Sequence, residues 1–299
     1  MLGNDRLLTT LARLVKSVKA DGVSVCAHAK TRRVFRFANE AIHQDLVQES
    51  IDVTLKAVDD RRIGIASTDT LEPASLKRCA NAAMNLARLS PQREDIAALP
   101  GKHHILKRTD YNPATAGYPA KASVQSLKQL LRICQGAGAA LAGSLMTGED
   151  EFAVVNSAGV SCYAASTVCG AKLVTFYRQL SGYASEAHHD ISQLNLEETL
   201  KRSLKQSLRP ETPVTLAVGS YDVILEPEAV ADLMIWLGYT AFGAKSFEEH
   251  SSFLAGRMGE QLMDKRITIY DDGTDSLVLR MPFDFEGTPK KKVLLIDRG

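Results

Sequence analysis

The stretch Pro213-Val-Thr-Leu-Ala-Val-Gly-Ser-Tyr-Asp-Val-Ile-Leu-Glu-Pro-Glu-Ala-Val-Ala-Asp-Leu-Met234 decides how the rest of the chain is interpreted. Apolar residues alternate with small or polar ones from 214 to 218, and a second apolar run follows at 223–225, which predicts two short strands around a turn. From Pro227 onward the apolar residues recur every three or four positions, as they do on one face of a helix. Proline suits a first helical turn, and Glu228 lies at the positive end of the helix dipole. The pattern therefore predicts a helix that begins near Pro227.

Four sequence blocks follow one another in the last third of the chain. They are G-x-Y-D-V-x-L-x-P-E-A-V-A-x-L from Gly219, S-F-L-x-G-x-x-G-E from Ser252, I-x-D-D from Ile269 and D-x-E-G-x-P from Asp284. In this order they resemble the TldD/PmbA family, also called modulators of DNA gyrase. One short motif is a weak signal, but several motifs in a fixed order are hard to obtain by chance.

The resemblance also indicates which kind of family member this chain is. TldD-like members carry H-E-x-x-x-H on this helix, where two imidazoles hold zinc and the glutamate acts as general base. Here Glu228 matches that glutamate, whereas Pro227 and Asp232 stand where the two histidines would be. Proline has no side-chain donor, so the resemblance points to the PmbA (TldE) side of the family, which lacks the zinc motif. No catalytic residue, metal ligand or cofactor is expected in this chain, and zinc is expected in a TldD-like partner.

The resemblance implies a subunit of a TldD/TldE-type metalloprotease complex that acts on peptides or unfolded proteins. The expected partners are a TldD-like subunit, or a second copy of this chain, and a peptide substrate. One alternative is a non-enzymatic module that homodimerises and binds peptides or proteins. Another is a self-sufficient peptidase that uses Glu228 and Asp232 as unusual ligands, which would require bound metal in the purified chain.

Further candidate positions lie in the later blocks. A peptide cleft or a subunit interface is expected at Ser252, Phe253, Gly256, Gly259, Asp284, Glu286 and Gly287. The two glycines of the second block serve either a tight loop or a close approach of ligand, and the sequence leaves both interpretations open. The acidic pairs at Asp271-Asp272 and Asp284–Glu286 are more typical of turns than of a cation site. His188-His189-Asp190 is interpreted as a strand end, because neighbouring strand residues point to opposite faces.

Composition limits the class of protein. The 299 residues are 45% hydrophobic and 24% charged, with a formal net charge of +1. These values are typical of a globular protein with about two domains and give no overall field for nucleic acid or membrane binding. No long apolar segment and no signal peptide is apparent, so a cytoplasmic location is expected. The five cysteines form no C-x-x-C pair and are interpreted as reduced core thiols.

The elements predict an α+β fold. Residues 1–89 form a helix/meander/helix unit, with helices expected at 5–19 and 73–89 and strands at 23–28, 33–39, around 41–49 and at 51–58. Residues 90–119 form a proline-containing linker or long loop, and residues 120–209 form a second α+β unit with a turn at Asn156–Gly159 and a closing helix at 196–208. Residues 210–299 are expected to begin a β-rich C-terminal domain that is incomplete here. Family members continue beyond this point, and an unfinished sheet would expose an edge, so a C-terminally truncated product is expected.

Overall fold

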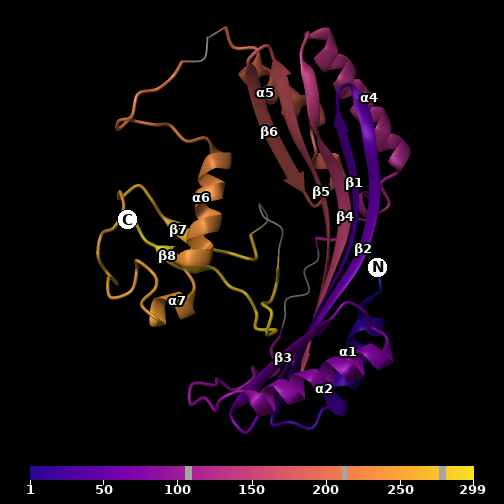
Figure 1. Cartoon of the computed structure of the whole chain (residues 1–299), viewed down its shortest axis with the longest axis vertical. Coiled ribbons are helices and arrows are strands. Elements are labelled where there is room, and N and C mark those ends of the chain that lie inside the picture. The colour runs from indigo at the N-terminus through magenta and orange to yellow at the C-terminus, as the bar shows by residue number, and fades with distance from the viewer. Residues whose placement is uncertain (105–109, 211–213, 276–280) are drawn as a thin grey trace. The chain divides into compact units, whose positions relative to one another are not determined.

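The computed structural model of the chain describes residues 1–104, 110–210, 214–275 and 281–299. These residues form two compact units, each of which is described by itself (Figure 1). Unit 1 comprises Met1–Pro213 and Gly273–Lys290, and unit 2 comprises Val214–Asp272 and Lys291–Gly299. The chain therefore leaves unit 1, returns to it for one segment, and leaves it again.

Unit 1 is built on a six-stranded antiparallel sheet with the order β3-β2-β1-β4-β5-β6. Its strands are β1 (Gly22–Ala38), β2 (Ala41–Asp59), β3 (Arg62–Thr68), β4 (Ala140–Asn156), β5 (Ser161–Tyr177) and β6 (Leu180–His188). β1 pairs with β4 from Ser24↔Asn156 to Phe37↔Gly143. Residues 1–89 and 120–209, which the sequence suggests as separate units, thus contribute strands to one sheet. This helix-and-sheet architecture confirms the α+β fold.

The strands are longer than the sequence indicates. Separate strands were predicted at 23–28 and 33–39, but β1 continues through the polar residues between them, so that prediction is wrong. The same correction applies to β2, which joins the predicted runs 41–49 and 51–58. Pairing with long neighbours on both sides keeps the polar middle of β1 extended, because sheet context outweighs the propensity of individual residues.

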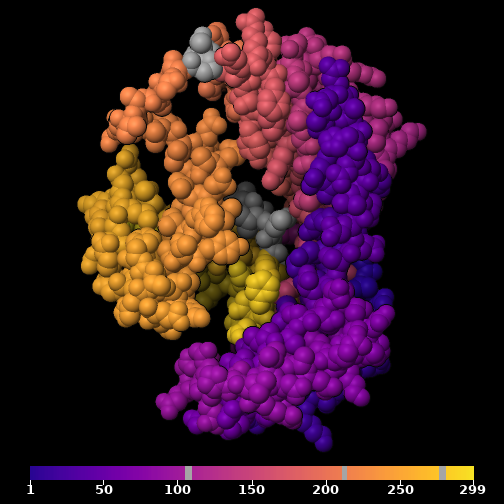
Figure 2. Space-filling model, in the orientation of Figure 1, coloured from indigo at the N-terminus to yellow at the C-terminus, as the bar shows by residue number. Residues whose placement is uncertain are grey.

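β3 covers only part of its neighbour. It pairs with residues 53–59 of β2, so residues 41–52 lie at the edge of the sheet. Most side chains from 41 to 50 are exposed. In Figure 2 the indigo-to-violet part of the chain, which includes β1 and β2, forms a long column on the surface. Leu46 and Val47 are among the exposed apolar residues on this edge.

Helices cover the two ends of the sheet. α1 (Asn4–Ser17) and α2 (Pro73–Leu89) pack at one end, and α4 (Ala120–Gly136) and α5 (Leu196–Ser207) pack at the other (Figure 1). α2 and α5 agree with the helices predicted from periodicity, and α1 begins and ends within two residues of its predicted bounds. A short helix, α3 (Pro113–Ala116), lies in the predicted loop and is capped by Asn112, which accepts hydrogen bonds from two backbone N–H groups.

Each end of the sheet has its own core. Beneath α1 and α2 lie apolar residues of β1, β2 and β4, among them Val25, Leu55 and Ala153, all fully buried. Beneath α4 and α5 the core contains Phe37 and Leu173. Burial of side chains of this size contributes roughly 1.5–3 kcal/mol each, so these two clusters stabilise the long sheet at both ends.

The segment 281–289 returns to the sheet from a distant part of the sequence. Alternate residues of β4 face opposite sides, so that Ala153 faces the core under α1 and α2 while Phe152 and Val154 face a third cluster with Phe283. Phe283 is fully buried, and its ring stacks on Phe152 at a centroid distance of 5.5 Å. The ring of Phe285 meets the ring of Phe152 edge-on. This contact explains why the segment belongs to unit 1.

Unit 2 contains two helices and a small sheet. α6 (Pro227–Thr240) begins at the predicted proline, α7 (Ala244–Glu248) follows, and β7 (Ile269–Asp271) pairs with β8 (Val293–Ile296). The two strands predicted within 214–225 are not formed, because the described residues of this stretch pair with no other strand. Alternating apolar residues become a strand only where a partner strand satisfies their backbone groups. Among the described residues from 214 to 299, the strands are β7 and β8.

Candidate functional site

The three positions matched to the zinc motif lie on the first turns of α6. Pro227 is the first helical residue and Glu228 the acidic residue of the first turn, as the sequence predicts. Asp232 follows four residues after Glu228, which places the two carboxylates on the same side of the helix. Proline offers no ligand atom, so these residues do not fit a zinc site with two imidazoles.

No other candidate metal centre is formed by the described residues. Residues 1–104, 110–210, 214–275 and 281–299 contain no group of three or more His, Cys, Asp or Glu side chains placed to hold a metal ion. His188 ends β6 and its Nε2 lies 2.9 Å from Oε1 of Glu186. The backbone carbonyl of His189 accepts a hydrogen bond from the hydroxyl of Thr167. His188 and His189 thus make contacts that stabilise the end of β6.

Ser252 ties the second sequence block to the end of α6. Its side chain is buried, its hydroxyl donates to the carbonyl of Ala241 at 2.8 Å, and its oxygen accepts from the N–H of Leu254 at 3.1 Å. Phe253 beside it is 43% exposed. The serine therefore fixes the loop, while the phenylalanine leaves part of its apolar ring at the surface.

The two glycines of this loop are required by backbone conformation. Gly256 has φ +75° and Gly259 has φ +83°, a region that favours glycine. A Cβ added at either position would meet no atom within 4 Å. The left-handed backbone conformation is thus sufficient to explain why glycine occupies both positions. Close packing within unit 2 does not explain it.

The block at Asp284–Pro289 lies in unit 1 and forms a tight turn. One carboxylate oxygen of Asp284 accepts from the N–H groups of Glu286 and Thr288, both at 2.9 Å. Gly287 is buried with φ +84°, and a Cβ there would collide with Val160. Glu286 pairs with Lys56 at 2.7 Å. The recognisable acidic residues of this block thus hold the turn and attach it to the sheet.

The candidate residues are consequently divided between the two units. Pro227, Glu228, Asp232 and the loop from Ser252 to Gly259 belong to unit 2, whereas Asp284, Glu286 and Gly287 belong to unit 1. Within unit 2, the hydroxyl of Ser252 connects the loop to the C-terminal end of the helix that carries Glu228 at its other end.

A buried polar network on β4 and β5 was not found from the sequence. Glu151 is 3% exposed and accepts hydrogen bonds from the N–H of Gly3 at 2.7 Å and from the hydroxyl of Tyr163 at 2.7 Å. Burial and the adjacent Glu151 carboxylate raise the pKa of Tyr163. The network anchors the start of the chain to the sheet. The sequence signal is weak, since an acidic run at 149–151 is more typical of a turn.

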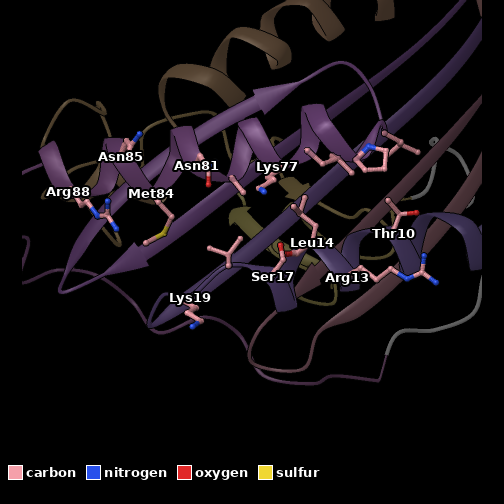
Figure 3. Close-up of a pocket in the computed structure, with 15 residues that line it drawn as sticks. Thr10, Arg13, Leu14, Ser17, Lys19, Lys77, Asn81, Met84, Asn85 and Arg88 are labelled. Atoms are coloured by element: carbon pink, nitrogen blue, oxygen red, sulfur yellow. The ribbon is translucent and has the colours of Figure 1, made fainter.

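A second feature that the sequence analysis missed is a groove of about 960 Å³ in unit 1. It runs between α1 and α2, and Figure 3 shows Lys77, Asn81 and Met84 of α2 opposite Leu14 and Ser17 of α1. The available signal was the presence of single basic residues at intervals on the polar sides of two amphipathic helices.

None of the helices in the described ranges is both long and apolar enough to cross a membrane.

Comparison with known proteins identifies the C-terminal part of the chain. Residues 218–299 match the PmbA/TldA metallopeptidase C-terminal domain. An uncharacterized protein from Methanocaldococcus jannaschii is 29% identical over 147 residues, which cover 49% of this chain and 35% of the relative. The match thus spans only about a third of that relative's length.

Two solved structures share the fold over nearly the whole chain. TldE from Thermococcus kodakarensis has a TM-score of 0.80 at 20% identity, covering 97% of this chain and 68% of that one. A proposed modulator of a DNA gyrase from Thermotoga maritima has a TM-score of 0.82 at 19% identity, covering 98% of this chain and 69% of that one. At these identities the likeness concerns the fold. Residues 218–299 thus match the C-terminal domain of the PmbA/TldA metallopeptidases, and the chain as a whole shares the fold of TldE and of the Thermotoga maritima protein.

Proposed function

We propose that this chain is a non-catalytic, PmbA/TldE-like subunit of a TldD/TldE-type metalloprotease complex that cleaves peptides or unfolded proteins. The observation that carries the proposal is the start of α6, where Pro227 and Asp232 replace the two imidazoles of the zinc motif. A catalytic zinc ion needs neutral nitrogen or charged ligands at several fixed positions, and proline supplies none. Zinc and the activated water then belong to a TldD-like partner.

The surface of α6 supports a role in assembly. No residue of this helix is buried, and its exposed apolar side chains are Val230, Leu233, Ile235, Trp236 and Tyr239. A helix that is apolar around most of its circumference is normally covered by other protein. Trp236 and Tyr239, which are 68% and 79% exposed, are residue types that contribute strongly to interface energy. We assign this surface to the contact with the catalytic partner.

The contribution of this chain to the reaction is enclosure and positioning. Phe253 and the glycine loop lie in the same unit as α6, and an extended peptide is held there by apolar contacts. No step of bond cleavage is assigned to side chains of this chain, because the residues at the matched positions do not fit the metal.

Three samples test the proposal: this chain alone, a TldD-like paralogue with H-E-x-x-x-H alone, and their mixture. Zinc content and cleavage of an unfolded peptide are recorded on the same size-exclusion fractions. We expect one complex that cleaves, with zinc in the paralogue and neither zinc nor cleavage in this chain. Stoichiometric zinc and cleavage in this chain alone would show that Glu228 and Asp232 belong to a self-sufficient peptidase.

The exposed helix also favours a second candidate, a homodimer that binds peptides without proteolysis. The same apolar residues of α6 would then contact a second copy. A chain that dimerises alone, binds unfolded peptide and does not associate with the paralogue would establish this alternative in place of the protease subunit.

A further inference from the structure

The groove between α1 and α2 combines an apolar floor with a positively charged rim. Its floor contains Leu14, Leu76 and Ala80, each between 5% and 6% exposed. These residues belong to the core cluster at this end of the sheet, against which the partly buried Met84 also packs. The floor is therefore a rigid surface supported from below by strands β1 and β2.

Four exposed cations surround this floor: Arg13 and Lys19 from the first helix and its C-terminal flank, and Lys77 and Arg88 from α2. The lining includes no Asp or Glu. None of the four forms an ion pair with any residue that the structure describes. In a chain whose net charge is only +1, this is a local concentration of positive charge with uncommitted donors.

The dimensions of the groove fit a helix. Its lining residues on α2 extend from Pro73 to Arg88, which is roughly 22 Å at a rise of 1.5 Å per residue. An amphipathic helix of about 15 residues has this length and places apolar residues at i, i+3, i+4 and i+7 on one side. Asn81 and Asn85 on the wall are placed to donate and accept hydrogen bonds along such a ligand.

We propose that the α1/α2 groove is a docking site for an acidic amphipathic helix of a partner protein. The apolar stripe of the ligand covers Leu14 and Met84, and carboxylates on its flanks pair with the four cations. This interaction is independent of the protease-subunit proposal, since the groove lies wholly in unit 1 and uses no residue of α6.

The shape of the groove favours a helix over an anionic membrane or a nucleic acid. The apolar floor is nearly buried and the cations around it are exposed, so a flat bilayer would touch the rim without reaching the floor. A nucleic acid would use the cations but leaves the apolar floor without a function, because its backbone contacts are largely electrostatic. A narrow rod with one apolar side uses both features.

The test uses three synthetic 15-residue peptides with the same leucine stripe and with glutamate, lysine or glutamine on the remaining positions. Binding to the full chain is measured by fluorescence anisotropy, and the methyl resonance of Met84 is followed by NMR. We expect only the glutamate peptide to bind and to shift the Met84 resonance. A glutamate peptide with serine in place of leucine should not bind, because the apolar stripe is gone.

A charge-reversal pair provides the matched control. Arg13→Glu with Lys77→Glu should weaken binding of the glutamate peptide at least about tenfold, because each changed contact reverses sign. Arg6→Glu with Lys16→Glu changes the net charge equally on exposed positions outside the groove and should leave binding within about twofold. Circular dichroism confirms that both variants fold.

Four results would overturn the proposal. The first is no binding by the glutamate peptide, and the second is equal binding by the lysine peptide. The third is binding to phosphatidylserine vesicles or to a single-stranded RNA oligonucleotide that is lost in Arg13→Glu/Lys77→Glu while the peptide does not bind. The fourth is concentration-dependent self-association abolished by the same pair, which would make a second copy the occupant.

Discussion

His28 on β1 and Asp150 on β4 contact each other across the centre of the sheet, with 2.9 Å between Nε2 and Oδ1. Arg32 donates to the other oxygen of the same carboxylate at 2.6 Å. Burial raises the pKa of Asp150, but the hydrogen bonds and charges of His28 and Arg32 outweigh it, so the pKa lies below its usual value. This ionised carboxylate holds the polar middle of β1 in the sheet.

Asp150→Asn should therefore destabilise unit 1 in a pH-dependent way. Because the folded pKa is lowered, the contribution of Asp150 is present above the unfolded pKa of about 4 and is lost as the pH falls through the folded pKa. At pH 7 we expect a loss of about 2 kcal/mol in the free energy of unfolding, and little difference from the original chain near pH 2–3. Urea unfolding followed by far-UV circular dichroism measures both.

The control for this prediction is Asp45→Asn, which removes an exposed ion pair with Arg33. Surface pairs contribute roughly 0–1 kcal/mol, so this variant should change stability much less at pH 7. If both variants lost the same free energy of unfolding, the contacts of Asp150 would stabilise the fold no more than an exposed ion pair does.

Gly287 should tolerate alanine far less well than Gly256. Both have positive φ, but a Cβ at Gly287 would overlap Val160, whereas a Cβ at Gly256 meets open space. Gly256→Ala should lose roughly 1–2 kcal/mol from backbone strain alone. Gly287→Ala should lose more than this and should release the 281–289 segment, detected as faster amide exchange of Phe283. Similar behaviour of the two variants would contradict the close packing described for this turn.

The five cysteines should be unreactive in the folded chain. All are free, four are buried, and burial raises the pKa of Cys26 to about 12 and that of Cys169 to about 11. Since the thiolate is the reactive form, native protein at pH 8 should show almost no reaction with Ellman's reagent, and five equivalents should react in denaturant. If one thiol per native chain reacted rapidly with the reagent, at least one of the five cysteines would have to be exposed and have a low pKa, which contradicts their burial in the structure.

Under the proposed function, Glu228→Ala should leave the cleavage activity of the proposed complex with a TldD-like subunit within a few fold. Glu228 lies in the first turn of α6, where its charge stabilises the helix N-terminus. Alanine at the glutamate of the partner's H-E-x-x-x-H motif should instead reduce cleavage on the order of 10²–10³-fold, the loss typical of a removed catalytic group. A loss of that size from Glu228→Ala would place this residue among the catalytic groups.

Trp236 reports directly on the proposed interface of α6. It is the single tryptophan of the chain and is 68% exposed. Addition of the TldD-like paralogue should shift its emission to shorter wavelength, because the indole moves from water into an apolar contact. The spectrum of the paralogue mixed with Trp236→Phe provides the background to subtract. An unchanged tryptophan spectrum in a complex that forms would exclude this face of α6 from the contact.

Several parts of the molecule followed from the sequence by itself. Apolar periodicity located α1, α2, α5 and the start of α6, because a helix closes its backbone hydrogen bonds within its own segment. The sequence also shows that positions 227 and 232 carry proline and aspartate and not histidine, because this depends only on residue type. The order of the four blocks was enough to indicate the family.

Only the tertiary structure decided how these parts are connected. Strand pairing is non-local, so the union of β1 with β4, the continuous course of β1, and the unpaired state of residues 214–226 depend on which neighbours are present. The return of Phe283 to the sheet and the α1/α2 groove likewise arise from packing between segments far apart in the chain. Residue types determine which hydrogen bonds and apolar contacts each segment can make. Packing between segments that are far apart in the sequence determines which of these interactions form.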